Sequence, residues 1–422
     1  MLSSENLKTI NPHDKTRYWK SISLSYYKNR DIITNIDIPE KQEYTFARKV
    51  RIYPSTKQKE LFNQFLGANR YFYNKTNHYI KNNESDPKRF NHFYMRKKMF
   101  ENPKPWYDDI PYDSKSLAIK QCITAYKSAL SNLKNGNIES FDIGYLRKKG
   151  TSQVFFVDTR AFDFESKSIF PRRLKANKIL RIKEDIEATG CSNVILLKIK
   201  PGRWFLCVPY CKKVQDQPIY NTPPYKNVFL DPGGRTFQTC YNSDTQTFTK
   251  LGDGFIDDKL MQLALKVDKL ISIKSKAKGR TKYNLSKRCA KIRYHMKNMI
   301  TNLHYQSINY LTKNFQNIFL PYFDTTRISN HIERNINNKA VRKLMMLSHG
   351  MFRERLEHAV KAKQRNLFYV PEAYTTKTCP ACGKQNDIGA SKVHSCSCGY
   401  KGDRDETAAL NIFISTLTRT NN

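Results

Sequence analysis

Short hydrophobic runs separated by polar residues, Gly and Pro predict two groups of β-strands, and the first run alternates between hydrophobic and polar positions. The first group starts at residue 44 with "EYTFARKVRIYP" and continues between residues 139 and 213 with "TSQVFFVDTRAF", "SNVILLKIKP" and "GRWFLCVPYC". The second group starts at residue 227 and contains "NVFL", "TFQTCYN" and "TFTKLG", followed later by "NIFL" and "NLFYV". These runs are rich in β-branched and aromatic residues, which favour strands.

Helical periodicity occupies the segments between these strands. Ser55 and Gln58 have capping-box spacing at the start of "STKQKELFNQFLGANRYFYNKT". The sequence that follows continues to predict helices as far as Gly136, a residue that can stop a helix. Apolar residues recur every three or four positions over residues 257–315, which predicts helices there. Further helices are predicted near 338–362 and in "DETAALNIFISTL".

The order of these elements predicts an α+β protein with several domains, because 422 residues exceed one ordinary core. The predicted segments are a flexible leader (1–43), a β domain (44–60 and 137–215), a helical segment that interrupts it (61–136), a Pro-rich linker (216–226) and a C-terminal domain (227–422) with an inserted ribbon (375–402).

The charge of the chain indicates a polyanionic partner. Lys and Arg number 74 against 37 Asp and Glu, which gives a net charge of +37. Between Met261 and Ile300 there are twelve Lys or Arg residues and one acid, Asp268. For the whole chain, an anionic membrane surface is the alternative partner. For residues 261–300 the alternative is a solvated helix face, but such a face usually mixes charges, so the imbalance favours a surface that follows phosphates. The candidate nucleic-acid contacts are Lys148, Lys149, Lys287, Arg288 and Arg293.

No run approaches the roughly 18 apolar residues that a membrane span needs. The N-terminal residues also lack the apolar core of a signal peptide. The sequence therefore predicts a soluble intracellular protein that does not bind a membrane, in the nucleus of a eukaryotic or virus-infected cell or in the cytoplasm. Its oligomeric state is left open.

Two closely spaced cysteine pairs predict a structural zinc site. Zn²⁺ takes four ligands in a tetrahedron, and Gly383 and Gly399 directly follow the pairs, where such turns need a positive φ. A disulfide or redox site is the alternative, but it does not suit two pairs in an intracellular chain. His394 is interpreted as an exposed loop residue. The candidate ligands are Cys379, Cys382, Cys396 and Cys398.

Three acids stand at the ends of apolar elements. Asp231 ends "NVFL", Glu372 follows "NLFYV", and Asp405 begins the last helix. Taken singly, Asp231 could be a turn residue and Asp405 an acid that complements the helix dipole. Asp403 and Glu406 have the spacing of a capping pair, so we expect Asp403 to be the cap and Asp405 to point elsewhere.

One shared metal site explains all three acids together. Converging carboxylates repel one another unless they bind hard divalent cations, and Mg²⁺ prefers oxygen ligands. Two such ions about 4 Å apart can activate a water and stabilise the leaving oxygen of a phosphodiester. In so basic a protein, this pattern predicts cleavage of nucleic acid.

Several motifs resemble those of a known family. "VFLDPGGRTF", "YTTKTCPACG" with "CSCG", and "DRDETAALNIF" resemble the three C-terminal signatures of the TnpB and Fanzor nucleases, which are transposon-associated relatives of type V CRISPR effectors. "RIYPSTKQKELFNQFLGANRYFYN" resembles their N-terminal motif, and "LSHGMFRERLEHAVK" matches the helix before the ribbon. The resemblance covers most of the chain from about residue 44 and is strongest over 227–415.

The resemblance implies a RuvC-like nuclease domain of the RNase H fold with an inserted zinc ribbon, and a wedge-type β-barrel interrupted by a helical recognition segment. It implies a guide RNA that directs Mg²⁺-dependent cleavage of DNA beside a short motif, with base pairing reading most of the target. Asp231 and Asp405 would be the first and third catalytic acids, and with Glu372 they would hold the magnesium.

The second acid departs from the bacterial pattern, since Tyr322 stands where that pattern has Glu. Fanzor-type members often carry an acid just ahead of the ribbon instead, as "VPEAYTTK" does. We therefore favour Glu372 over Asp324 as the second acid. Glu333 lies further along the chain in a polar segment. Thr407 also replaces the usual Asn of the last motif.

Three functions compete on these grounds. The first is an RNA-guided DNA endonuclease. The second, suggested by Tyr322, is a catalytically decayed or domesticated relative that binds nucleic acid without cutting it. The third is a transposase, but the chain lacks the His-hydrophobe-His and Tyr apparatus of a strand-transferase, so transposition would need another protein.

Overall fold

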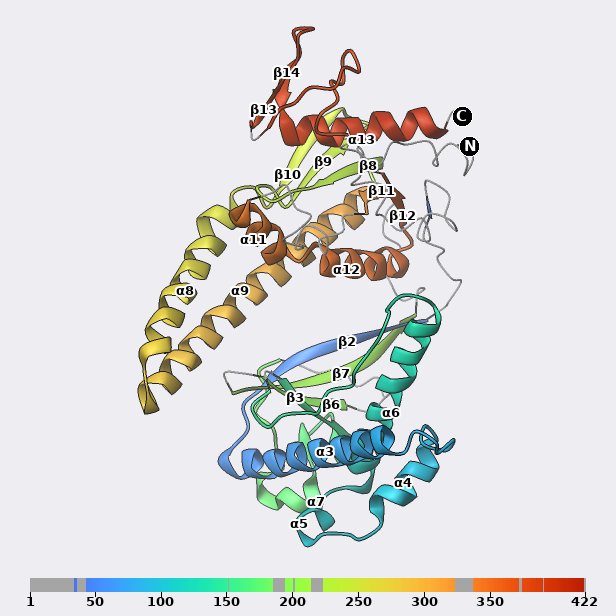
Figure 1. Ribbon diagram of the computed structural model, residues 1–422, viewed down its shortest axis with the longest axis vertical. Coiled ribbons are helices and arrows are strands. Elements are labelled where there is room, and N and C mark those ends of the chain that lie inside the picture. The colour runs from blue at the N-terminus through green and yellow to red at the C-terminus, as the bar shows by residue number, and fades with distance from the viewer. Residues whose placement is uncertain are drawn as a thin grey trace. The chain divides into compact units, whose positions relative to one another are not determined.

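The computed structural model describes residues 34–35, 43–150, 152–184, 194–199, 202–213, 223–322, 337–371, 374–389 and 391–420. The chain divides into two compact units, drawn in Figure 1. One unit is Glu43–Lys213, and the other comprises Met1–Gln42 and Val214–Asn422.

The Glu43–Lys213 unit is built on a four-stranded antiparallel sheet of order β2-β7-β6-β3. Its strands are β2 (Glu43–Ile52), β3 (Ser152–Val157), β6 (Val194–Ile199) and β7 (Arg203–Lys213). The edge strands β2 and β3 do not pair with each other in the described part of the unit, so the sheet is open. No closed barrel is found among these described residues, in contrast to the barrel that the resemblance implied.

Helices interrupt this sheet between β2 and β3, as the sequence predicted. They are α3 (Thr56–Asn82), α4 (His92–Phe100), α5 (Pro105–Asp108) and α6 (Tyr112–Lys134), and the short elements β4 (Phe162–Asp163), β5 (Ser168–Ile169) and α7 (Pro171–Leu174) come after β3. The capping box at Ser55 and Gln58 is confirmed. Phe62 and Phe65 of α3 pack against Phe155 of the sheet, so helix and sheet share one core.

The second unit contains a six-stranded mixed sheet of order β1-β12-β11-β8-β9-β10. Its strands are β1 (Thr34–Asn35), β8 (Tyr225–Pro232), β9 (Gln238–Asn242), β10 (Thr247–Leu251), β11 (Phe315–Pro321) and β12 (Asn366–Val370). Strands β8, β11 and β12 are parallel, and β8, β9 and β10 form an antiparallel meander. β1 pairs with β12, so these residues of the expected flexible leader form a strand.

Helices cover both faces of this sheet (Figure 1). They are α8 (Met261–Lys276), α9 (Gly279–Asn314), α11 (Asn338–Leu347), α12 (His349–Ala362) and α13 (Arg404–Thr420). Side chains alternate along a strand, so β8 contributes to two cores. Val228 and Leu230 pack with α9 and α12, whereas Phe229 packs with α13.

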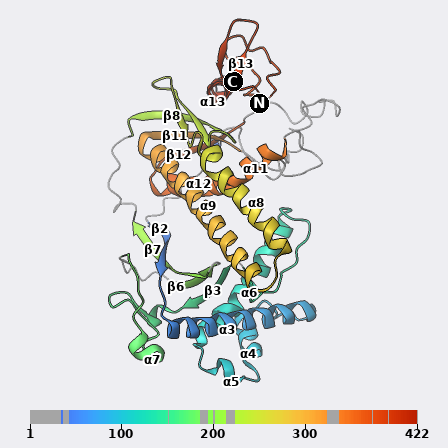
Figure 2. The same ribbon diagram turned by 90° about the vertical axis from the view of Figure 1, so that its left-hand side faces the viewer.

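The long helices α8 and α9 lie side by side as an antiparallel pair that extends away from the sheet (Figure 2). Between β12 and α13 the chain forms the ribbon, whose strands β13 (Val393–Ser395) and β14 (Lys401–Asp403) pair antiparallel. Of the helices that the structure describes, none combines the length and apolar character of a membrane span.

Candidate functional site

Asp231 lies at the carboxyl end of β8 and points to the face that α13 covers. It is two residues beyond Phe229, and side chains two apart in a strand share a face. Part of Asp231 remains accessible, but protein atoms crowd its carboxyl group. This burial, and next the charge of Asp405, raise the pKa of Asp231 to about 7, against a smaller opposing effect of Arg404.

Asp405 lies in the first turn of α13, where Asp403 fixes the backbone. The Asp403 carboxylate accepts hydrogen bonds from the amides of Asp405 and Glu406 at 2.8 and 3.2 Å, which confirms the predicted cap. Burial alone would raise the pKa of Asp403, but these bonds and one from Lys250 hold it below its ordinary value. The Asp405 side chain therefore takes no part in the cap, and its charge acts on Asp231.

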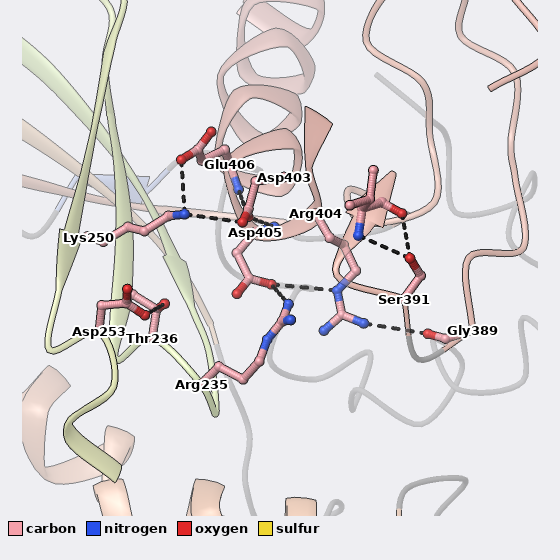
Figure 3. Close-up of polar contacts among 11 residues, drawn as sticks. Arg235, Thr236, Lys250, Asp253, Gly389, Ser391, Asp403, Arg404, Asp405 and Glu406 are labelled. Atoms are coloured by element: carbon pink, nitrogen blue, oxygen red, sulfur yellow. Dashed lines mark hydrogen bonds and ion pairs between the residues drawn. The ribbon is translucent and has the colours of Figure 1, made fainter. Parts of the chain in front are cut away.

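Lys250 ties the start of α13 to the sheet (Figure 3). Its Nζ lies 3.1 Å from Asp403 Oδ2 and 3.0 Å from Glu406 Oε1. Burial opposes its charge, but the two carboxylates outweigh that effect and raise the pKa of Lys250. Because Lys250 belongs to β10, this contact sets the helix terminus against the edge of the sheet.

Two arginines contact Asp405, as Figure 3 shows. Arg235 donates from Nη2 to Asp405 Oδ1 at 2.9 Å, and Arg404 Nε lies 3.5 Å from the same oxygen. The Asp405 side chain is only 14% exposed. We call Asp231 and Asp405, together with these two arginines, the paired-acid site.

The loop between β8 and β9 carries Arg235 and is tightly folded. A Cβ on Gly233 would come within 2.7 Å of the carbonyl oxygen of Thr236, so this position requires glycine. His349 of α12 donates from Nε2 to the carbonyl of Gly233 at 3.1 Å, and Thr236 donates to Asp253 at 2.9 Å. The loop is therefore held on both sides of Arg235.

Two buried histidines stack on Phe237, the residue after Thr236. The ring centroids of His304 and His349 lie 5.1 and 5.2 Å from that of the Phe237 ring. His304 donates from Nε2 to the carbonyl of Leu347 at 2.8 Å, and its Nδ1 accepts from Arg355 at 2.7 Å. Burial lowers the pKa of each histidine to about 4, so both are neutral near pH 7.

The proposed second acid, Glu372, lies outside the described residues, as do Asp324 and Glu333. The strands that lead toward Glu372 are described. Val370 of β12 pairs with Pro321 of β11, and β11 runs parallel to β8. The carboxyl ends of the three parallel strands therefore meet at one edge of the sheet, the edge where Asp231 lies.

Tyr322, which replaces the usual acid, directly follows β11. Its ring contacts the Tyr369 ring at 6.1 Å, and the guanidinium of Arg353 lies 4.2 Å from its centroid. A phenol stacked under a guanidinium offers no carboxylate at the end of β11.

The four predicted cysteine ligands converge. Their sulfur atoms all lie within 4.8 Å of one another, with Cys379 and Cys398 at 3.6 Å and Cys382 and Cys396 at 3.6 Å. A tetrahedron of sulfurs about 2.3 Å from Zn²⁺ has edges of about 3.8 Å, so this donor set fits zinc. The amide of Cys398, followed by Asn386, lowers the pKa of Cys396 to about 6. For Cys382 a bond from the amide of Lys384 is outweighed by the neighbouring thiols, which raise the pKa, so Cys396 is the readier of the two to become a thiolate.

The turns of the ribbon follow the predicted pattern. Gly383 and Gly399 have φ of 72° and 94°, in the region that favours glycine. The expectation for His394 was wrong, because its ring is fully buried. It packs against Tyr400, and its ring nitrogens lie 3.4 Å from the carbonyl of Thr376 and from Asn386 Nδ2. His394 belongs to the core of the ribbon and is not among the grouped metal ligands.

The ribbon is clamped to α13. Asn411 donates from Nδ2 to the carbonyls of Thr375 and Thr378, each at 2.7 Å. Thr407, which replaces the family's usual Asn, is buried and lies 3.0 Å from the hydroxyl of Tyr400. These contacts join the ribbon to the helix that presents Asp405.

A basic cavity lies between α8 and α9. Its volume is about 500 Å³, and among the described residues its lining contains no carboxylate. The lining residues are Lys266, Asn284, Lys287, Arg288, Lys291 and Ile292. Asp268, the one acid of the segment, accepts a 2.7 Å hydrogen bond from Arg342 of α11. Two predicted contacts, Lys287 and Arg288, therefore share one cavity.

The other predicted contacts lie elsewhere. Arg293 is exposed on α9 outside this cavity lining, and Lys148 and Lys149 are exposed in the Glu43–Lys213 unit. Sequence reasoning assigned no role to Arg235, Lys250 or Arg404. Arg235 and Arg404 lie within the motifs "VFLDPGGRTF" and "DRDETAALNIF", so their position beside two acids was the available signal.

Two parts of the chain match known protein families. Residues 349–412 match the family described as "Cas12f1-like, TNB domain", and residues 44–83 match a family described as "Helix-turn-helix domain", of the OrfB IS605 type. In this structure residues 44–83 contain strand β2 and helix α3. Residues 349–412 span α12, the ribbon and the start of α13.

Similar proteins occur in large viruses. "Putative transposase A625R" of Paramecium bursaria Chlorella virus 1 is 29% identical over 395 residues, which cover 88% of this chain and 87% of that protein. "TnpB-like protein L79" of Acanthamoeba polyphaga mimivirus is 25% identical over 390 residues, covering 87% and 72%. "Putative transposase R186" of the same virus is 31% identical over 215 residues, half of this chain and 43% of that protein.

The solved structures that match this chain include a Cas12f1–sgRNA–target DNA complex, with a TM-score of 0.34, 15% identity, and coverage of 87% of this chain and 98% of that one. The mini-RNA-guided endonuclease CRISPR-Cas_phi3 has a TM-score of 0.42 and 11% identity, covering 92% and 94%.

The fold and the cysteine site define an α+β protein with a Cas12f1-like TNB domain. The chain is similar to TnpB-like proteins and to proteins named transposase, and the resemblance of its motifs to TnpB is confirmed.

Proposed function

We propose that this protein is an RNA-guided, Mg²⁺-dependent DNA endonuclease associated with a transposable element. The observation that carries the proposal is the effect of Asp405 on Asp231. These two acids come from a helix and a strand that are far apart in sequence, and the charge of Asp405 adds to burial in raising the pKa of the Asp231 carboxyl. The kinship with TnpB-like proteins and with transposases supports it.

We also propose that the C-terminal domain (227–422) is a RuvC-like nuclease domain. The order β12-β11-β8-β9-β10, with an antiparallel meander followed by two parallel strands, supports an RNase H-type sheet. The ribbon enters between β12 and α13, as the resemblance implies. The helical segment 61–136 and the β domain around it would be the recognition and wedge parts.

The residues of the paired-acid site suit magnesium. Carboxylate oxygens are its preferred ligands, and two crowded carboxylates gain most from a cation between them. We propose that Asp231, Asp405 and Glu372 hold it. Bound magnesium would activate a water and stabilise the leaving oxygen of the phosphodiester. Lys250 and Asp403 keep Asp405 directed at Asp231, and α13 screens the buried end of β8 from bulk water.

Glu372 makes the chain a Fanzor-like variant in this proposal. Adjacent parallel strands deliver their carboxyl ends to one edge, and β12 is the strand that leads to Glu372. Tyr322 at the end of β11 is engaged by Arg353, which supports a second acid from the neighbouring strand instead. We place zinc in the cysteine site as a structural ion, because all four ligands come from the protein.

The nucleic acids are assigned to the basic surfaces. We propose that the cavity containing Lys287 and Arg288, with Arg293 further along α9, contacts phosphates of the guide RNA or target DNA. Lys148 and Lys149 would contribute contacts from the other unit. The pairing of Asp268 with Arg342 leaves the hairpin of α8 and α9 without a free acid among its described residues.

The test begins with the RNA that copurifies with the full chain. We expect one RNA species with a fixed 3′ end, and Mg²⁺-dependent cleavage of DNA that matches it. Asp231→Ala and Glu372→Gln should each reduce cleavage by about 1,000-fold or more without loss of DNA binding. The control is Asp244→Ala, an exposed carboxylate in the turn after β9, which should cut normally.

Cleavage that survives Asp231→Ala would refute the site. Binding of the RNA and of matching DNA without cleavage, with Mg²⁺ or Mn²⁺, would favour the alternative of a catalytically decayed relative, which the Tyr322 substitution suggests. Random cellular RNA in place of one defined species would refute guidance.

A further inference from the structure

We propose that Arg235 is a competing cation of the paired-acid site: it holds Asp405 while no metal is bound, and a divalent ion has to displace it. The protein's affinity for the metal is thereby lowered by one of its own side chains. This inference rests on the proposed nuclease site.

The contact itself is a charge-assisted hydrogen bond in a restricted environment. Arg235 Nη2 lies 2.9 Å from Asp405 Oδ1, with the two side chains 28% and 14% exposed. Arg404 approaches the same oxygen at 3.5 Å. Oδ1 is thus already engaged by donors, so a metal that takes this oxygen competes with the closer guanidinium for its lone pairs and its charge.

The Arg235–Asp405 bond is not required to hold either element in place. The loop on one side of Arg235 is fixed by the bond from His349 to Gly233, and on the other by the bond from Thr236 to Asp253. Figure 3 shows Arg235 reaching from this loop to Asp405. A purely structural arginine would be expected where other contacts are missing.

The helix side of the contact is equally well fixed. Asp403 accepts hydrogen bonds from the amides of Asp405 and Glu406, and Lys250 binds both Asp403 and Glu406. Since loop and helix are each anchored without Arg235, its guanidinium can leave Asp405 without loss of the local fold. That freedom is what a displaceable cation needs.

The electrostatics explain why such a cation belongs here. Without a metal, Asp231 and Asp405 face each other in a partly buried site, and their repulsion would destabilise it. One guanidinium on Asp405 offsets this repulsion. A divalent ion that contacts both carboxylates offsets it better, so exchange favours the metal once its concentration is sufficient.

The test measures metal binding locally, without DNA cleavage. Fe²⁺ bound in place of Mg²⁺, with hydrogen peroxide as the oxidant and ascorbate as the reductant, generates hydroxyl radicals that cut the polypeptide near its site, and Mg²⁺ that competes for the site suppresses the cuts. Fe²⁺ is held well below its own dissociation constant, so the Mg²⁺ concentration that halves the cuts reports the affinity for Mg²⁺. In the full chain with its copurified RNA, peptide cuts near Asp231 and near Asp405 are quantified by mass spectrometry over a Mg²⁺ series. Asp405→Asn identifies which cuts belong to this site.

We expect Arg235→Gln to lower the Mg²⁺ concentration that halves these cuts by about tenfold, because a charge-assisted competitor is lost. The Mg²⁺ concentration that halves the cuts in Arg235→Lys should lie between the values for the wild type and Arg235→Gln. The matched control is Arg342→Gln, which breaks an ion pair of similar length, 2.7 Å to Asp268, outside the site. It should leave the midpoint unchanged.

The outcomes separate the two proposals. Site-specific cuts whose midpoint is unchanged or higher in both Arg235 variants would overturn the competing-cation role but leave the magnesium site intact. Absence of cuts that depend on Asp405 in the wild-type protein would overturn the magnesium site and this inference with it. Arg235→Lys keeps the test decisive if Arg235→Gln does not fold.

Discussion

The ribbon and the paired-acid site assemble their functional groups in different ways. The ribbon takes its four ligands from residues 379–398, in two turns that each need only a local backbone conformation. The paired-acid site takes one acid from β8 and another from α13, and it exists only when a complete sheet and its covering helix are in place. The first is a local property of the chain, and the second is a property of the fold.

The two regions also differ in their effect on stability. Thiolates that gain a zinc ion stabilise the folded ribbon. Carboxylates that face each other in a crowded site without a metal destabilise the fold that brings them together. The predictions below test this contrast, from the largest expected effect to the smallest.

The largest effect should come from the ribbon. Cys396→Ser should abolish stoichiometric zinc binding and unfold residues 375–402, because a structural zinc site contributes about 10–16 kcal/mol of binding free energy. Elemental analysis and hydrogen exchange measure the two results. Cys207→Ser, at a half-buried cysteine outside the ribbon, should retain full zinc content. Normal zinc content in Cys396→Ser would contradict the four-ligand assignment.

Removing the charge of Asp231 should raise the free energy of unfolding, whereas loss of a zinc ligand lowers it. Its pKa is raised to about 7 from an ordinary value near 4, so without metal the free energy of unfolding falls as the pH rises through this window. Asp231→Asn should therefore raise stability above pH 7 by up to about 4 kcal/mol and flatten the profile between pH 4 and 7. Chemical denaturation in EDTA measures this.

Equal stability of Asp231→Asn and wild type across that pH range would show that the site is not strained without metal. Asp244→Asn, at an exposed turn, provides the baseline and should leave the profile unchanged.

The histidine stack beneath the site predicts a third effect. His304 and His349 have pKa values of about 4 in the fold, below the 6.5 of an unfolded chain, so their contribution is complete above pH 6.5 and is lost toward pH 4. Each histidine should lower the free energy of unfolding by about 3 kcal/mol as the pH falls from 6.5 to 4. The double variant His304→Gln/His349→Gln should show a shallower acid loss of unfolding free energy.

The exposed His295 supplies the control for that measurement. His295→Gln should retain the wild-type acid slope. An unchanged slope in the double variant would mean that other groups cause the loss.

The smallest effect concerns the link between sheet and helix. Lys250→Met removes two partly exposed ion pairs, so we expect a loss of only about 1 kcal/mol in stability. Hydrogen exchange at the first turn of α13 should nevertheless increase. Lys343→Met breaks one comparable pair with Asp257 and should not change that turn. Protection at α13 that is equal in both variants would refute the positioning role of Lys250.

The sequence predicted what depends on nearby residues. Three features could be predicted because each involves partners a few positions apart. They are the capping box of Ser55 with Gln58, the cap of α13 by Asp403, and the cysteine ligands. Strand patterns also identified both sheets. The alternation of Val228 and Phe229 assigns side chains to opposite faces once a strand is assumed, but it does not say what covers each face.

Contacts between distant segments could not be predicted from the sequence. The bond of Arg235 to Asp405 and the bond of Lys250 to Asp403 join elements whose pairing is set by the whole sheet. His394 was expected to be an exposed loop residue because the four cysteines already complete the zinc site, yet it is fully buried and packs against Tyr400. Pairing of Thr34–Asn35 with β12 gave no local signal at all.

The alternation along β8 restricts how this chain can vary in length. Inserting or deleting one residue just before Asp231 would rotate its carboxylate to the face of α12, away from its partner on α13. A change of two residues would restore the direction while displacing the acid along the strand. Exposed turns tolerate such events better, so homologous chains should keep the length of this strand.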